Sequence, residues 1–370
     1  MKIVFLTRYD PKNILNWSGT LYHMYYQLKK EHHVEIMGAE ILDQQKSFIK
    51  GNFHENFLSI TDRYVKNLGQ LLSERINILQ FDLVFFGDLL FYPLNIQIPF
   101  IHLSDMTFEQ VNIHIKKSDE KNVESCIYLE KLILNCSTKI IYTSEWIKHK
   151  AIETYNIDPN KIEVVELGAN IPWPDKYSIN IDMVVCRLVF IGTNWEKKGG
   201  DKVLQTYRLL KTGGFSCSLT IIGSTPKEIP DADENLTIIP FLNKEKKEHL
   251  DRLCKILSES HFLVLPTEFD AYGIVFCEAS AYGVPSITSN VGGVGQPVHE
   301  EKNGFLLPSD ATAQDYAEKI KTVFNDRENY TRLRVSSRRE FETRLNWDVW
   351  GEKVNIILED TVEKWKSTHV

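Results

Sequence analysis

The stretch that decides the fold is Thr267–Pro285, with the sequence TEFDAYGIVFCEASAYGVP. It follows an apolar run, Phe262–Pro266, of the length expected for a buried strand, and from Gly273 onward the pattern predicts a helix. In a strand, loop and helix of this kind, the first N–H groups of the helix are free to bind an anion. The stretch therefore predicts a strand–loop–helix unit, an arrangement that can bind an anion at the start of its helix.

Two carboxylates, Asp270 in the loop and Glu278 in the helix, lie eight positions apart. The neighbours of Glu278 in the sequence are mostly apolar, so its charge is costly unless hydrogen-bond donors surround it. Two interpretations remain open. The donors belong to another part of the protein, or they are hydroxyls of a bound sugar or ribose, with the helix start holding a phosphate.

The pattern P-T-x-x-D-x-x-G-x-x-x-x-E-A-x-A-x-G-x-P resembles the signature of retaining glycosyltransferases of the GT-B, glycogen-synthase-like group (glycosyltransferase family 4-like). In that family the first acid, usually Glu, contacts the donor sugar, and the second holds the ribose. The resemblance implies these roles for Asp270 and Glu278. It also implies that the helix start, Gly273 with Ile274 and Val275, binds the donor nucleotide. The shorter acid at 270 leaves the choice of donor sugar open.

The composition is that of an ordinary soluble protein with two domains: 370 residues, 43% hydrophobic and 25% charged. A net charge of −7 argues against general nucleic-acid binding. The six cysteines form no C-x-x-C pair, which favours reduced thiols in the cytoplasm over a zinc site or disulfides. The N-terminus does not resemble a signal peptide, and no apolar run reaches the roughly 18 residues of a membrane span.

Short apolar runs alternate with helical patterns in the first half of the chain, which predicts a doubly wound, mostly parallel sheet with ligands at the carboxyl ends of strands. The expected strands are Ile3–Thr7, Val34–Met37, Asp82–Phe86, Pro99–Leu103, Lys139–Thr143 and Ile162–Glu166.

Two residues of this first half are candidates for the site. Gly19 begins the helix after the first strand, with Ser18 as its expected N-cap, and in the resembling family a glycine-rich turn here faces the donor. His102 lies at the end of a strand, where the family often has a His or an acid near the sugar or acceptor. The role of its neighbour Asp105 stays open.

The second half opens with a strand, Leu188–Ile191, followed by Gly192, Lys198 and a helix. This resembles the family's diphosphate-binding turn, in which glycines admit the phosphates closely and a lysine supplies positive charge. The family often has an Arg shortly after the first glycine, where this chain has Thr193 and Asn194. Lys198 is thus the expected principal cation, and Lys197 is expected to be solvated.

Further strands, Leu219–Ile222, Leu236–Ile239 and Ser286–Thr288, are expected in this half. The family holds its nucleobase after the second of them, where Phe241 packs either on the base or in the core. Gly292 and Gly293 follow the third and are expected to line the donor sugar or phosphate. A dinucleotide fingerprint would need a third glycine and a helix, which the following Gln-Pro does not supply, so a nicotinamide site is rejected.

The resemblance implies an α/β protein with two Rossmann-like domains facing across a cleft. Residues 1–180 would be the acceptor domain and 181–345 the nucleotide-sugar domain, with the helix 346–370 packing back on the first domain. The implied activity is metal-independent transfer of a sugar to a hydroxyl, in glycan or polysaccharide synthesis, with retention of configuration. Asp270, Lys198 and His102 would be its catalytic residues. It would need no cofactor beyond the nucleotide sugar, with UDP and GDP both open.

Two alternatives remain: a nucleotide-sugar epimerase of the same architecture, and a non-catalytic module that binds nucleotide sugars. The expected acceptor is a glycan, a lipid-linked sugar or a small molecule, bound by Asn52–Thr61 and Met106–Lys117. Lys116 and Lys117 admit a peripheral membrane contact, but Asp119 and Glu120 follow at once, which favours a solvated mixed face.

Overall fold

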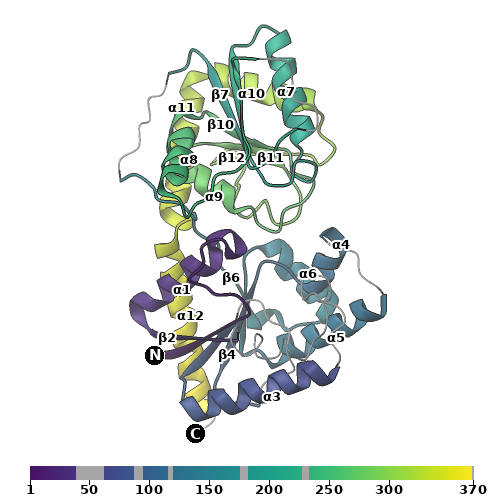
Figure 1. Ribbon diagram of the computed structural model, residues 1–370, viewed down its shortest axis with the longest axis vertical. Helices are drawn as coiled ribbons and strands as arrows, with labels where there is room; N and C mark the ends of the chain where they lie inside the picture. The colour runs from purple at the N-terminus through teal and green to yellow at the C-terminus, as the bar shows by residue number, and fades with distance from the viewer. Residues whose placement is uncertain (39–61, 87–94, 116–119, 176–181, 227–232, 369–370) are drawn as a thin grey trace. The chain divides into compact units, whose positions relative to one another are not determined.

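The computed structural model describes residues 1–38, 62–86, 95–115, 120–175, 182–226 and 233–368 (Figure 1). The chain divides into two compact units, one made of Met1–Val165 with Gly351–Val370 and the other of Glu166–Trp350. Each unit contains a parallel sheet flanked by helices, which confirms the predicted α/β class. None of the described helices is long and apolar enough to cross a membrane.

The described strands of the first unit pair in the order β2-β1-β3-β4-β5-β6, and every pair is parallel. Its elements are β1 (Lys2–Thr7), α1 (Thr20–Glu31), β2 (His33–Gly38), α3 (Asp62–Leu79), β3 (Leu83–Phe86), β4 (Phe100–Ser104), α4 (Phe108–His114), α5 (Glu120–Cys136), β5 (Lys139–Tyr142), α6 (Glu145–Tyr155) and β6 (Ile162–Val164). Strands buried on both faces read as continuous apolar runs, which is why the sequence located them.

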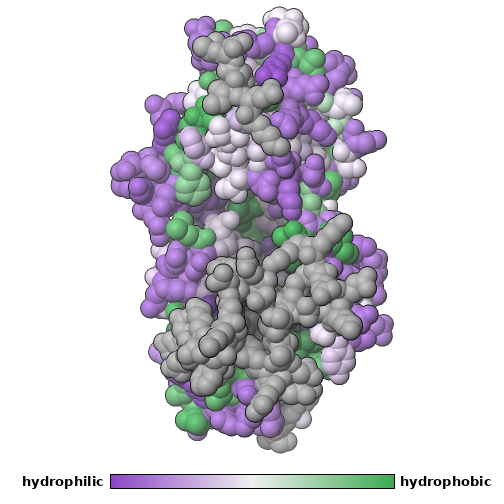
Figure 2. Space-filling view, turned by 45° about the vertical axis from the view of Figure 1, so that its right-hand side comes forward, coloured by the Kyte–Doolittle hydropathy of each residue, from purple (hydrophilic) through white to green (hydrophobic). Residues whose placement is uncertain are grey.

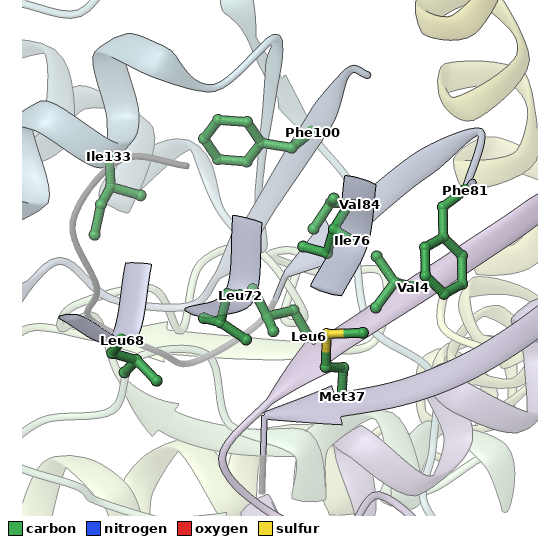
Figure 3. Close-up of a cluster of buried hydrophobic side chains, with 10 residues drawn as sticks. All are labelled: Val4, Leu6, Met37, Leu68, Leu72, Ile76, Phe81, Val84, Phe100 and Ile133. Atoms are coloured by element: carbon green, nitrogen blue, oxygen red, sulfur yellow. The ribbon is translucent and has the colours of Figure 1, made fainter. Parts of the chain in front are cut away.

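A hydrophobic cluster joins this sheet to α3 (Figure 3). Leu68, Leu72 and Ile76 recur every four residues, so they lie on one face of α3 and pack against Val4 and Leu6 of β1. This packing fixes the sheet from which the loops of the first unit project.

The C-terminal helix α12 (Trp347–Thr368) returns to the first unit, as expected, since Gly351–Val370 belong to that unit. His32 and Asn355 are hydrogen-bonded at 3.1 Å between Nε2 and Oδ1. A Cβ on Gly351 would approach the side chain of Gln27 to 2.2 Å, so glycine permits the close contact with α1.

The second unit has the strand order β12-β11-β10-β7-β8-β9, again with parallel pairs. Its elements are β7 (Cys186–Ile191), α7 (Gly200–Thr212), β8 (Cys217–Ile222), β9 (Leu236–Ile239), α8 (Lys247–Glu259), β10 (Phe262–Leu265), α9 (Ile274–Ala281), β11 (Ser286–Ser289), β12 (Gly304–Leu307), α10 (Ala313–Asn325) and α11 (Arg327–Arg344).

This order is that of a Rossmann fold, in which the chain adds strands first on one side of the starting strand and then on the other. The reversal falls between the neighbouring strands β7 and β10. Ligands of open α/β sheets bind outside the carboxyl ends of strands at such a switch point. The topology therefore predicts a ligand site at the loops after β7 and β10.

The segment after Val165 belongs to the second unit because its backbone is hydrogen-bonded there. The Leu167 carbonyl accepts from the Tyr272 hydroxyl at 3.2 Å, and the Pro172 carbonyl accepts from the Tyr282 hydroxyl at 2.8 Å. The units therefore meet in sequence at 165/166, ahead of the boundary expected at 180/181, which lies outside the described residues.

The surface and the thiols agree with the composition. Hydrophilic residues predominate among the coloured residues on the face shown in Figure 2. All six cysteines are free thiols.

Candidate functional site

The loops after β7 and β10 are built against each other at the switch point. The carbonyl of Lys197 accepts hydrogen bonds from the Glu268 N–H at 2.9 Å and the Thr267 hydroxyl at 3.1 Å. Gly199 has φ +74°, and a Cβ there would come within 2.0 Å of the Pro266 carbonyl oxygen. Only glycine permits this approach, so the sequence locks the two loops into one structure.

Lys198 and Asp270 form an ion pair across these loops, with 2.5 Å between Nζ and Oδ2. The lysine side chain is 24% exposed and the aspartate side chain 18%, so a ligand can reach both. The structure thus brings together the predicted phosphate-binding cation and the predicted sugar-contacting acid.

Two helices begin beside this ion pair, and both have a left-handed glycine as N-cap. Gly199 caps α7 and Gly273 caps α9, and neither helix receives a side-chain cap in the described part of the chain. Their first N–H groups therefore carry a partial positive charge that a phosphate can use. Since Ile274 is half-buried and Val275 buried, these two residues would act on a ligand chiefly through their backbone.

The predicted glycines lie around the same ion pair. Gly293 N–H donates to the Asp270 carbonyl at 3.0 Å, and a Cβ on Gly292 would come within 2.3 Å of that oxygen. A Cβ on Gly192 would lie 3.0 Å from Cγ of Lys198. The absence of these side chains leaves room for the loop after β11 and for the stem of Lys198.

Glu278 lies on α9 with its side chain only 3% exposed, and it forms an ion pair with Lys244. Lys244 lies between β9 and α8, in the charged run Asn243–Glu248. Sequence reasoning missed it because such a run is typical of a solvated surface, and only the fold brings it to α9. The protein itself thus supplies a countercharge to Glu278. A ribose would have to bind the part of the carboxylate that Lys244 does not occupy.

Phe241, the residue expected at the nucleobase, follows β9 and is 55% exposed. Because the ring is exposed, the alternative that Phe241 packs in the core is wrong. Its neighbour Leu242 is buried instead. An exposed ring after a strand end offers a surface on which a base can stack.

In the first unit, Gly19 is the N-cap of α1 with φ +95°. The expectation that Ser18 is the N-cap is wrong. Ser18 and Trp17 also adopt left-handed backbone conformations, and the helix starts at Thr20. The Trp17 indole donates to Asp105 Oδ2 at 3.2 Å. Asp105, whose role was open, therefore ties the glycine turn to the loop after β4.

His102 is the third residue of β4, and its side chain is buried with its ring edge-on to Tyr142. Burial lowers the pKa of His102 to about 4, since a charged imidazole would lose its hydration there. At neutral pH the ring is neutral, so it can offer a hydrogen bond but no positive charge.

We expect the ring resonances of His102, assigned by comparison with His102→Asn, to stay fixed from pH 8 to 5 in an NMR titration. The native pKa lies below the unfolded value of 6.5, so charging favours unfolding. The contribution of His102 to the free energy of unfolding is therefore fully present above pH 6.5 and is lost as the pH falls toward about 4. A midpoint near 6.5 would contradict the burial argument.

The two segments expected to bind the acceptor are only partly described. Residues 52–61 and 116–117 lie outside the described part. Residues 106–115 include α4, whose N-cap Thr107 accepts a hydrogen bond from the Gln110 N–H.

Comparison with known proteins finds similar glycosyltransferases in sequence and in fold. Residues 180–340 match the model of the family described as glycosyl transferases group 1. The match covers 161 of the 370 residues, somewhat less than half of the chain. Solved glycosyltransferases share the fold: one from Rickettsia africae has a TM-score of 0.65 at 15% identity and covers 98% of both chains. WaaG, a glycosyltransferase involved in lipopolysaccharide biosynthesis, has a TM-score of 0.66 at 14% identity over 96% of this chain and 99% of that one.

Curated glycosyltransferases are similar in sequence. The capsular polysaccharide biosynthesis glycosyltransferase CapM of Staphylococcus aureus is 26% identical over 64% of this chain and 66% of its own length. A D-inositol 3-phosphate glycosyltransferase of Jonesia denitrificans is 25% identical over 71% of this chain and 66% of its own. The matches thus span just under two thirds of these relatives.

Proposed function

We propose that this protein is a group 1 glycosyltransferase that moves a sugar from a nucleoside diphosphate to a hydroxyl acceptor, with retention of configuration and without a metal ion. The observation that carries the proposal is the Lys198–Asp270 ion pair at the switch point of the second sheet. Its two charges match the two parts of a donor that meet at the breaking bond, the diphosphate and the sugar. The glycine-capped starts of α7 and α9 add positive potential at the same place.

In the proposed reaction, the bond from the anomeric carbon to the diphosphate oxygen breaks, and a bond to the acceptor oxygen forms on the same face of the sugar. The acceptor proton passes to an oxygen of the leaving phosphate, so no protein base is needed. The Lys198 ammonium and the two helix starts stabilise the negative charge that develops on the diphosphate. Asp270 would accept hydrogen bonds from the sugar, and Glu278 would accept them from the ribose.

Two comparisons support the choice of substrates to test first. Solved structures of the Anabaena protein HepE, with TM-scores of 0.64 and 0.63 at 12% and 11% identity, contain UDP and UDP-glucose. CapM is named for capsular polysaccharide biosynthesis. UDP-sugars and glycan acceptors are therefore the first candidates, with GDP- and ADP-sugars as the comparison set.

The test is a thermal-shift panel of these nucleotide sugars, followed by transfer assays with and without EDTA. We expect one class of nucleotide sugar to raise the melting temperature with the logarithm of its concentration. Transfer should persist in EDTA and yield a product with the anomeric configuration of the donor, as read by NMR. Complete loss in EDTA, restored by magnesium or manganese, would contradict metal independence.

Other outcomes favour the alternatives. Conversion of the donor sugar without any acceptor would favour an epimerase, and binding without turnover would favour a binding module. No stabilisation by any nucleotide sugar would contradict the proposed function as a whole.

A further inference from the structure

Glu278 is buried in apolar surroundings, where an unpaired charge is unfavourable. The residue is 2% exposed, and on α9 its buried neighbours include Val275, Phe276 and Ala279. An ionised carboxylate in such surroundings is costly unless a countercharge or several donors face it. The group that faces Glu278 therefore decides how its carboxylate can meet a ligand.

The group that faces it is the ammonium of Lys244, which donates a hydrogen bond to Oε1 of Glu278. The lysine side chain is 20% exposed, so this ion pair lies at the edge of the interior. Within the described ranges, Lys244 is the one hydrogen-bond partner of the Glu278 side chain. The second carboxylate oxygen, Oε2, has no partner in that part of the protein.

The origin of Lys244 makes this contact specific to the folded sheet. The lysine follows β9, the last strand on its side, whereas α9 follows β10, and β7 and β8 lie between those two strands. The loop after β9 also carries the exposed Phe241, three residues earlier in the chain. One loop thus presents both an aromatic surface and the countercharge of the buried acid.

We propose that Lys244 is a positioning residue of the nucleotide site, which pairs with Glu278 and occupies its Oε1, so that Oε2 is the oxygen offered to the ribose hydroxyls. This inference rests on the proposed function. It gives two cations of the second unit different roles, because Lys198 binds the diphosphate whereas Lys244 supports ribose recognition through Glu278. Loss of Lys244 should therefore weaken the discrimination between ribose and a sugar without hydroxyls, and leave diphosphate binding in place.

The experiment measures, by calorimetry, the Kd of a nucleoside diphosphate and of its 2′,3′-dideoxy analogue for the wild type and Lys244→Met. The wild type should bind the ribose form more tightly by roughly tenfold or more, since hydrogen bonds to a charged group are involved. Lys244→Met should lose most of this preference while binding the dideoxy analogue about as well as the wild type does.

Three further variants complete the test. Lys244→Arg restores the cation and should restore the preference, whereas Lys244→Gln, which keeps a donor without the charge, should not. If Lys244→Met does not fold, the ribose preference of Lys244→Arg compared with that of Lys244→Gln tests the proposal. Lys246→Met, an exposed lysine two positions away, is the matched control and should behave as the wild type.

The contrary results are distinct. An unchanged preference in Lys244→Met, or equal weakening of both ligands, overturns the positioning role, because a merely structural lysine would affect both alike. A wild type that binds both ligands equally overturns it as well. A wild type that binds neither contradicts the proposed function itself.

Discussion

Replacing Lys198 by Ala should weaken the binding of every nucleoside diphosphate and lower turnover far more than replacing Lys197. A hydrogen bond to a charged group contributes about 1.5–3 kcal/mol, which corresponds to a loss of affinity of roughly tenfold to a hundredfold. Turnover should fall further, by roughly a hundredfold to a thousandfold, because the ammonium also stabilises charge that develops during the reaction. Steady-state kinetics with the donor identified in the panel measures both effects.

Lys197→Ala is the matched control. Lys197 holds the loop through its backbone carbonyl, which the substitution keeps, and the residue is exposed. Equal kinetics for the two variants would mean that the loop after β7 does not hold the diphosphate in the register proposed.

Substitutions of Glu278 and Asp270 should have different effects, because the two acids bind different parts of the donor. Glu278→Gln should weaken the free nucleoside diphosphate and the intact donor alike, by roughly tenfold to a hundredfold, because the ribose belongs to both. Asp270→Asn should bind the free nucleoside diphosphate about as well as the wild type, since Lys198 keeps its charge, yet it should lose transfer or donor-sugar discrimination. Calorimetric titration and transfer assays on both variants measure the difference.

Each variant serves as the control for the other, because the two isosteric changes remove one charge from the same strand–loop–helix unit. Thermal unfolding checks that both variants fold. If Asp270→Asn weakens the nucleoside diphosphate as much as Glu278→Gln does, the division between sugar and ribose is mistaken.

The sequence predicted the structure best where a local pattern has one physical explanation, such as a buried strand or a glycine at a close contact. The apolar run before Thr267 and the glycine at 273 predicted a strand and a helix start, and the structure has β10 and α9 at these places. Gly199 is similar, because its left-handed backbone and its contact with Pro266 leave no space for a side chain. The pairing of Lys198 with Asp270 needed more, since only the resemblance suggested that loops so far apart in the chain lie together.

Residues whose role depends on the fold alone escaped the sequence. Lys244 stands among other charges, and nothing in that run marks it as the partner of a buried acid three elements later. Asp105 and Ser18 show the same limit. The hydrogen bond from Trp17 to Asp105 and the left-handed backbone of Ser18 arise from how the loops after β1 and β4 meet.

The central claim is that one nucleoside diphosphate binds the second unit at both Lys198 and Glu278. The most direct test is calorimetric titration of a nucleoside diphosphate into the wild type and the double variant Lys198→Ala/Glu278→Gln, with folding of both checked beforehand. The account predicts one ligand bound per chain in the wild type and no measurable heat of binding in the double variant at the same concentrations. Binding by the double variant with the affinity of the wild type would contradict it.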